Sequence, residues 1–112
     1  MVIKRLEFPL AKAEYLLSHT TAPGEGGDKR KLWGEVLGFD SAESVREAIL
    51  AQVDLDTFEM IGPNSYGNRY QLIVLLKDTS DRIRHLRTIW IVLTGETVAR
   101  FVTAVPHKSR GN

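Results

Sequence analysis

Apolar residues in the first half of the chain recur three and four positions apart, as they do along one face of a helix. This spacing predicts three amphipathic helices, over residues 10–18, 29–37 and 41–52. Asp28 is a suitable cap for the second helix, and Gly38 is typical of a residue that ends one. The sequence DSAE that begins at Asp40 is typical of a capping box, so we expect Asp40 to cap the third helix.

In the second half the apolar residues alternate with polar ones or run continuously, and both patterns are typical of strands. They predict four strands, over residues 54–61, 69–77, 82–93 and 97–105. Short turn sequences between these segments favour antiparallel neighbours. Helices followed by strands indicate an α+β fold, so we expect three N-terminal helices packed on a four-stranded antiparallel β-meander.

The length of 112 residues fits a single domain, residues 1–112, with an ordered core over about 8–106 and a short C-terminal tail. The chain has no cysteine, which excludes disulfides, thiol catalysis and cysteine-based zinc sites. No apolar run approaches the roughly 20 residues that cross a bilayer, and the first ten residues lack the apolar stretch of a signal peptide. We therefore expect a cytoplasmic protein without membrane contact.

The net charge of +1 conceals two oppositely charged segments. Residues 35–59 carry seven acids and one base, whereas residues 82–112 carry six bases and one acid. A basic segment could hold phosphates, which supply most of the non-specific affinity for nucleic acids. The alternative is that these charges form ordinary solvated surface.

The histidines do not predict a metal site. His19, His85 and His107 lie in a loop, a strand and the tail, and none is paired at helical spacing with another ligand. We expect no metal and no cofactor. His19 follows a helix in a polar, glycine-rich segment, where it is either a general acid or base or an ordinary surface histidine.

The third predicted strand carries cations at its start. Alternation places His85 and Arg87 on one face, and Arg84 and Thr88 on the other. Arg87 either pairs with an acid such as Glu59 or lies in a groove and holds an anionic ligand. A slip of one residue in register would exchange the two faces.

Thr103 lies in the fourth predicted strand, among valine and alanine residues. Threonine is a good strand former, so its presence there needs no functional explanation. Alternatively, its hydroxyl faces the region of Arg87 on the neighbouring strand, because antiparallel neighbours bring such positions together.

Three stretches carry a family resemblance: YLLSHTTAPGEGGDKRKLWGEVLGFDSAESV, GNRYQLIVLLKD and TIWIVLTGETVARFVTAVP. Together with their spacing, over about residues 8–106, they resemble a small uncharacterised bacterial family. That family occurs as stand-alone genes and as the tips of polymorphic toxins. It is similar in turn to the barnase–EndoU–colicin–RelE superfamily of metal-independent ribonucleases.

The resemblance implies an endoribonuclease toxin that cleaves RNA through attack of a ribose 2′-hydroxyl on the adjacent phosphate. It implies a role in proton transfer for His19 or His85, and phosphate stabilisation by Arg87. Thr103 is a further catalytic residue that it implies, as a hydroxyl donor to the phosphate. The residues it implies in substrate contact are Lys29, Lys31, Arg84 and Thr88, with the two lysines at the phosphate and Thr88 as the alternative hydroxyl donor.

The resemblance also implies RNA as the substrate and an acidic antitoxin or immunity-type protein as a partner that covers the basic sheet face. The alternative is a non-catalytic interaction module that binds a partner, or a second copy of itself, through an exposed sheet edge or apolar patch. A small-molecule or nucleotide-binding domain on the same scaffold is a third hypothesis.

Overall fold

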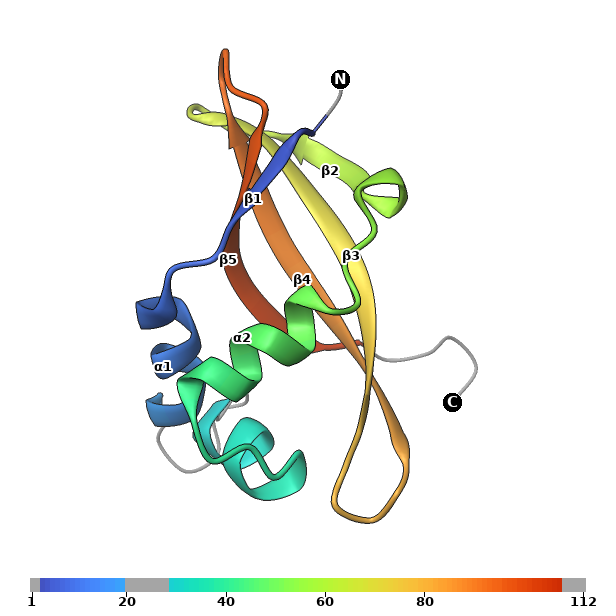
Figure 1. Cartoon of the computed structure of the whole chain (residues 1–112). Helices are drawn as coiled ribbons and strands as arrows, with labels where there is room; N and C mark the ends of the chain where they lie inside the picture. The colour runs from blue at the N-terminus through green and yellow to red at the C-terminus, as the bar shows by residue number, and fades with distance from the viewer. Residues whose placement is uncertain (1–2, 20–28, 108–112) are drawn as a thin grey trace.

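The computed structural model describes residues 3–19 and 29–107. Their centre is a five-stranded sheet in the order β1-β5-β4-β3-β2. The helices gather along one side of this sheet, as Figure 1 shows. The predicted α+β class and the antiparallel meander from β2 to β5 are confirmed. In the described part of the chain, no helix is long and apolar enough to cross a membrane.

The first predicted helix is confirmed with the same bounds, as α1 (Leu10–Ser18). The second is helical, but from residue 31 on it is a π-helix, η1 (Lys31–Val36). There the backbone N–H of Leu37 donates to the oxygen of Leu32, five residues back, at 2.8 Å. The expected cap, Asp28, lies outside the described residues.

The third helix, α2 (Ala42–Leu50), is capped by Ser41 and not by Asp40 as predicted. The hydroxyl of Ser41 accepts from the backbone N–H of Ser44 at 3.1 Å, in the way typical of an N-cap. Serine caps a helix as well as aspartate does, so the sequence placed the helix start correctly to within one residue.

Three long strands follow the predicted segments closely. They are β3 (Gly67–Lys77), β4 (Ile83–Leu93) and β5 (Val98–Pro106). The strand predicted over residues 54–61 was placed too early, because β2 spans Glu59–Pro63 and a short 3₁₀ turn, η2, spans Leu55–Thr57. Asp54 starts that turn by accepting the N–H of Asp56, a local bond that competes with strand pairing.

The prediction of four strands omitted β1 (Arg5–Glu7), which pairs in parallel with β5. Its pairing aligns Arg5 with Val98 and Glu7 with Arg100, at the far end of the sequence. Three residues are too few for an alternating pattern to be recognised. β1 forms one edge of the sheet and β2 forms the other.

The core lies between the helices and one face of the sheet, here called the inner face. Trp33 of η1 and Trp90 of β4 are fully buried there, and Phe8 packs edge-on against the Trp90 ring. The opposite or outer face carries residues that are half-buried or exposed: Gln71, Ile73 and Leu75 of β3; His85, Arg87, Ile89 and Ile91 of β4; Val102, Thr103 and Val105 of β5.

Candidate functional site

A β-bulge in β5 determines which side chains reach the outer face. Thr103 pairs with Ile89 and Phe101 pairs with Trp90, so Val102 is an extra residue between them. Because of this insertion, Val102 and Thr103 both lie on the outer face, while Phe101 and its inner-face neighbours stay buried. Bulges are often found where a strand re-aims a side chain beside a functional site.

The outer face is hollowed over β3, β4 and β5 into a cavity of about 590 Å³, here called the arginine cavity. Its lining residues are Ile61, Asn64, Arg69, Arg87, Ile89, Ile91, Val102 and Thr103. Two arginines, aliphatic side chains and no carboxylate therefore surround this space. Such a lining suits a ligand that has both a negative charge and an apolar surface.

The surroundings of Arg87 exclude the first of the two alternatives that the sequence left open, a direct pair with Glu59. Its Nη1 donates to Oε1 of Gln71 at 3.3 Å, and Nε2 of Gln71 donates to Oε1 of Glu59 at 2.7 Å. A neutral amide thus stands between the arginine and the acid. Among the described residues Arg87 forms no ion pair, so its charge faces the cavity without a carboxylate partner.

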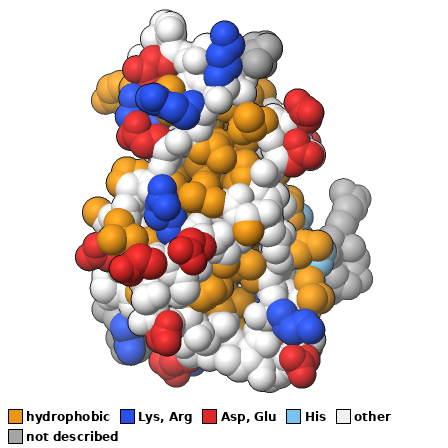
Figure 2. Space-filling view, in the orientation of Figure 1, with side chains coloured by type: hydrophobic (Ala, Val, Ile, Leu, Met, Phe, Trp, Pro, Cys, Tyr) orange, Lys and Arg blue, Asp and Glu red, His pale blue; other side chains and the backbone are white. Residues whose placement is uncertain are grey.

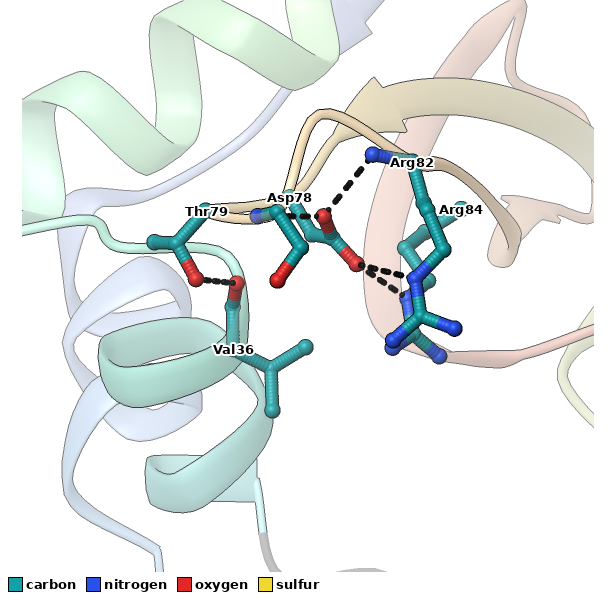
Figure 3. Close-up of polar contacts among 6 residues, drawn as sticks. Val36, Asp78, Thr79, Arg82 and Arg84 are labelled. Carbon is teal, nitrogen blue, oxygen red and sulfur yellow. Dashed lines mark hydrogen bonds and ion pairs between the residues drawn. The ribbon is translucent and has the colours of Figure 1, made fainter.

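Arg84, predicted to contact substrate, is instead engaged at the β3–β4 hairpin (Figure 3). Its Nε donates to Oδ2 of Asp78 at 2.8 Å, while the backbone N–H groups of Ser80 and Arg82 donate to Oδ1. The hydrogen bond from Arg84 and that from the Arg82 backbone lower the pKa of Asp78 to about 2. Arg84 therefore neutralises a buried carboxylate that shapes the turn.

Arg100 is also paired, although its strand partner Ile91 belongs to the outer face. Its guanidinium contacts Oε1 of Glu7 at 2.6 Å and Oε1 of Glu96 at 3.1 Å. The hydrogen bond that Arg100 donates to Glu96 and the nearby charges of both acids raise the pKa of Arg100. Its charge is therefore satisfied within the protein, in contrast to that of Arg87.

The structure places Thr88 where it cannot contact a substrate on the outer face. The residue is fully buried on the inner face, as alternation predicted. Its hydroxyl donates to the oxygen of Leu72 at 2.7 Å and accepts from Nε1 of Trp90 at 2.8 Å. The expectation that Thr88 supplies a hydroxyl to RNA is thus corrected: this hydroxyl belongs to the core.

A second cavity, of about 450 Å³, lies beside β5 and is here called the lysine cavity. Its lining residues are Pro9, Ala11, Lys12, Tyr15, Lys29, Val102 and Thr103. Nζ of Lys29 donates to the oxygen of Ala104 at 3.2 Å, and partial burial lowers the pKa of Lys29. The Thr103 Oγ1 atom is buried and has no hydrogen-bond partner among the described residues.

The predicted histidines lie apart from one another. The ring of His19 stacks on Tyr15 with 4.6 Å between centroids, which places it at the helical side near the lysine cavity. His85 is exposed on the outer face, two residues before Arg87, and pairs across the sheet with Leu75. Lys31 begins η1 and lines neither cavity.

In the described ranges, no three His, Cys, Asp or Glu side chains gather closely enough to hold a metal ion. Two cationic lining residues were missed at the level of sequence, Arg69 and Lys12. Alternation along β3 could have identified Arg69, because it lies two residues before Gln71 and shares its face. Lys12 carries no comparable signal, since it is one of several exposed residues of α1.

Comparison with protein-family models finds a match over most of the chain. The model described as "Domain of unknown function (DUF6883)" covers residues 4–108. Comparisons with curated proteins and with solved structures find no match. The match supports the predicted resemblance to an uncharacterised family, while the further link to ribonuclease toxins stays a prediction.

Proposed function

This chain belongs to the DUF6883 family, and we propose that it binds RNA on the outer face of its sheet and cleaves it there. The observation that carries the proposal is the state of Arg87: it lines a cavity and has no carboxylate partner among the described residues. A planar guanidinium with free donors suits a phosphate, which accepts two parallel hydrogen bonds from it.

The rest of the arginine cavity favours a nucleic acid over a simple anion. Arg69 lies on the same face and supplies a second cation, while Ile89 and Ile91 supply an apolar floor. Phosphates would contact the arginines, and an unstacked base would cover the aliphatic side chains. Single-stranded RNA exposes both groups, whereas in a duplex the bases are stacked inside.

For cleavage, the ribose 2′-oxygen attacks the adjacent phosphorus and the bond from phosphorus to the 5′-oxygen breaks. A base takes the proton of the 2′-hydroxyl, and an acid donates a proton to the leaving 5′-oxygen. The products are a 2′,3′-cyclic phosphate and a 5′-hydroxyl. Arg87 would stabilise the extra negative charge in the transition state.

His85 is the proton-transfer residue that we assign to this reaction. It shares the outer face with Arg87 and precedes it by two residues along the same strand, at a Cα separation of about 7 Å. It is exposed, so RNA can reach it, and an imidazole can both accept and donate a proton. His19 has no contact in the described residues that links it to Arg87, so we assign it no role in this reaction.

The test is incubation of the pure protein with a single-stranded RNA in EDTA, followed by separation of the products. We expect RNA with cyclic phosphate ends, and no cleavage of DNA of the same sequence, because DNA lacks the 2′-hydroxyl. Arg87→Gln should reduce cleavage by about 10²-fold or more and weaken RNA binding. His85→Gln should reduce cleavage by about 10²-fold and leave binding unchanged.

Lys77→Gln is the matched control, since Lys77 ends β3 outside both cavities and its replacement removes one positive charge. Equal effects of Arg87→Gln and Lys77→Gln would show that only total charge matters. Absence of RNA binding by the wild-type protein would overturn the proposal. Binding without cleavage would retain the interface and reject the catalytic step.

A second candidate function, a non-catalytic protein-interaction module, is favoured by exposed aliphatic residues. Leu75 and Val102 of the outer face are 45% and 39% exposed, and Ile83 at the start of β4 is 52% exposed. If this candidate is correct, Leu75→Ser should abolish partner binding while Arg87→Gln leaves it unchanged. An acidic antitoxin would pair with the arginines, so its binding should be lost in Arg87→Gln and kept in Leu75→Ser.

A further inference from the structure

We propose that the lysine cavity is a second phosphate subsite on the path of the same strand, so that the ligand is an oligonucleotide that crosses β5 at the Val102 bulge. This inference rests on the proposed RNA binding and extends it. It assigns a substrate class: single-stranded RNA with at least two phosphates in contact, as opposed to a mononucleotide. The assignment depends on four observations, taken in turn below.

The first observation is continuity between the two cavities. Val102 and Thr103 line both cavities, and the two cavities lie on opposite sides of this bulged segment. Because the bulge turns these two adjacent residues to the same face, β5 offers a shared rim at that point. A flexible chain can pass over such a rim and occupy both hollows.

The second observation is charge. Together the two linings contain four cations, Lys12, Lys29, Arg69 and Arg87, and no carboxylate. A third cavity, of about 420 Å³ between α1 and α2, is lined by Glu43 and Glu47 as well as Arg46. On the helical side Figure 2 likewise shows basic and acidic side chains mixed. A polyanion is therefore favoured along the rim of β5 and not elsewhere among these cavities.

The third observation is the unused capacity of Lys29. An ammonium group has three donors, and one of them is directed to the oxygen of Ala104. The other two can be offered to a phosphate in the lysine cavity, which the side chain lines. Burial lowers the pKa of Lys29, and a phosphate beside it would favour the charged form again.

The fourth observation is the hydroxyl of Thr103. Its Oγ1 is buried and unpaired within the described ranges, although buried hydroxyls are normally hydrogen-bonded. Since Thr103 lines both cavities, a rotation of its side chain about the Cα–Cβ bond would bring this hydroxyl to a phosphate oxygen at the rim, which would provide the missing acceptor. Thr103 would then contact the nucleotide link between the two subsites.

The experiment measures fluorescence anisotropy of a labelled uridine decanucleotide between 50 and 300 mM salt, because the salt dependence of the affinity reports the number of phosphate contacts. Each oligonucleotide carries 2′-O-methyl groups, so that the wild-type protein cannot cleave it. For single strands the slope of log affinity against log salt is about −0.7 per neutralised phosphate. Because Lys12 and Lys29 surround one phosphate subsite, we expect Lys12→Gln/Lys29→Gln to reduce the slope by about 0.7 and the affinity by about tenfold or more. A competing UpU dinucleotide, which fits one subsite, should bind the wild type and this variant alike.

Arg69→Gln/Arg87→Gln should weaken the binding of both the decanucleotide and UpU, because it removes the cations of the arginine cavity. Lys77→Gln is again the control for total charge, and it is compared with Lys12→Gln, which also removes one charge. Lys29→Arg should keep the wild-type slope, since it keeps the cation. Lys12→Gln alone guards against misfolding, because the Lys12 side chain is exposed on α1, and it should reduce the slope by less than the double variant does.

The outcomes distinguish failure of the second subsite from failure of the proposed RNA binding on which it rests. If the lysine variants behave like Lys77→Gln while the arginine variant loses RNA, the second subsite is rejected and RNA binding stands. If the wild type binds neither ligand, the proposed function itself is rejected. Tighter binding of an RNA hairpin duplex than of the single strand would also reject the assigned substrate class.

Discussion

The indole Nε1 of Trp90 donates to the hydroxyl of Thr88 at 2.8 Å, in the centre of the core. The same hydroxyl donates to the oxygen of Leu72 at 2.7 Å, so one side chain satisfies two buried polar groups. This relationship explains why a threonine is fully buried among aliphatic and aromatic residues. It also provides a sharp test of how the core is held together.

Thr88→Val keeps the shape of the side chain and removes the hydroxyl. We expect it to lower the free energy of unfolding by about 1–3 kcal/mol, because it leaves the Trp90 N–H buried without a partner. Thr88→Ser keeps the hydroxyl and should cost about 1 kcal/mol, for one lost methyl group. Urea denaturation measures both losses. A Thr88→Val variant as stable as the wild type would contradict the role assigned to the hydroxyl.

Gly38 allows the β3–β4 hairpin to dock on η1. Thr79 donates from its backbone N–H and its hydroxyl to the oxygen of Val36, at 3.0 and 3.2 Å (Figure 3). Gly38 has φ +78, and a Cβ at this position would lie 2.8 Å from Cγ2 of Thr79. We expect Gly38→Ala to destabilise the fold by about 2–4 kcal/mol, through backbone strain of roughly 1–2 kcal/mol and the collision.

Two further variants separate these contributions in thermal or urea unfolding. Gly95 has φ +84 and open space around its position, so Gly95→Ala should show the strain alone. Thr79→Ser removes Cγ2 and keeps the hydroxyl, so the double variant with Gly38→Ala should recover the collision energy. A double variant whose losses simply add would show that the two residues do not interact.

Asp78 predicts a specific acid sensitivity. Its pKa in the folded state is about 2, below its ordinary value of 3.8, so its ionised form stabilises the fold. That contribution is complete above about pH 4 and is lost as the pH falls through about 2. We expect the free energy of unfolding to fall more steeply over this window in the wild type than in Asp78→Asn.

Urea titrations at several values between pH 7 and pH 2 measure this difference. Asp56→Asn is the control, because Asp56 is exposed in η2 and its pairing involves the backbone N–H alone. It should lose stability with pH in parallel with the wild type. Parallel loss in Asp78→Asn as well would show that the Asp78 carboxylate does not stabilise the hairpin.

The side-chain amide of Gln52 forms the hydrogen bonds that a neighbouring strand would form at the unpaired edge of β3. Its side-chain amide donates to the oxygen of Leu75 and accepts from the Leu75 N–H at 2.8 Å. The ladder with β2 ends at Gln71, so Leu75 has no strand partner on that side. We expect Gln52→Ala to expose the Leu75 amide to solvent, with a loss of about 0.5–1.5 kcal/mol.

Hydrogen exchange of the Leu75 amide measures that effect directly. Gln52→Glu keeps the acceptor oxygen and replaces the donor, so it should retain most of the protection of this amide. If exchange at Leu75 is the same in Gln52→Ala and in the wild type, the side chain does not protect the edge.

The elements that the sequence predicted well are those with long local patterns. α1 has the predicted bounds, and β3, β4 and β5 match their segments to within about two residues. β1 was missed because a three-residue strand has no pattern of its own. β2 was placed too early because the side chain of Asp54 forms a local turn that hydrophobicity does not reveal.

The alternation of β4 correctly placed His85 and Arg87 on one face and Thr88 on the other. Backbone geometry alone fixes that property, because successive residues of any strand point to opposite sides. The face of Thr103 could not be obtained in this way. An insertion at Val102, visible only in the pairing of β4 with β5, turned it outward.

The sequence by itself determined the helices, the meander and the sides of its long strands, since each follows from contacts between residues close in the chain. Only the tertiary structure decided which cations are neutralised. Asp78 engages Arg84, and Arg100 engages Glu7 from 93 positions away, while Arg87 receives a neutral amide. The pairing of Arg100 with Glu7 depends on packing between distant segments, and that of Arg84 with Asp78 depends on the geometry of the hairpin turn, so no hydrophobic pattern encodes either.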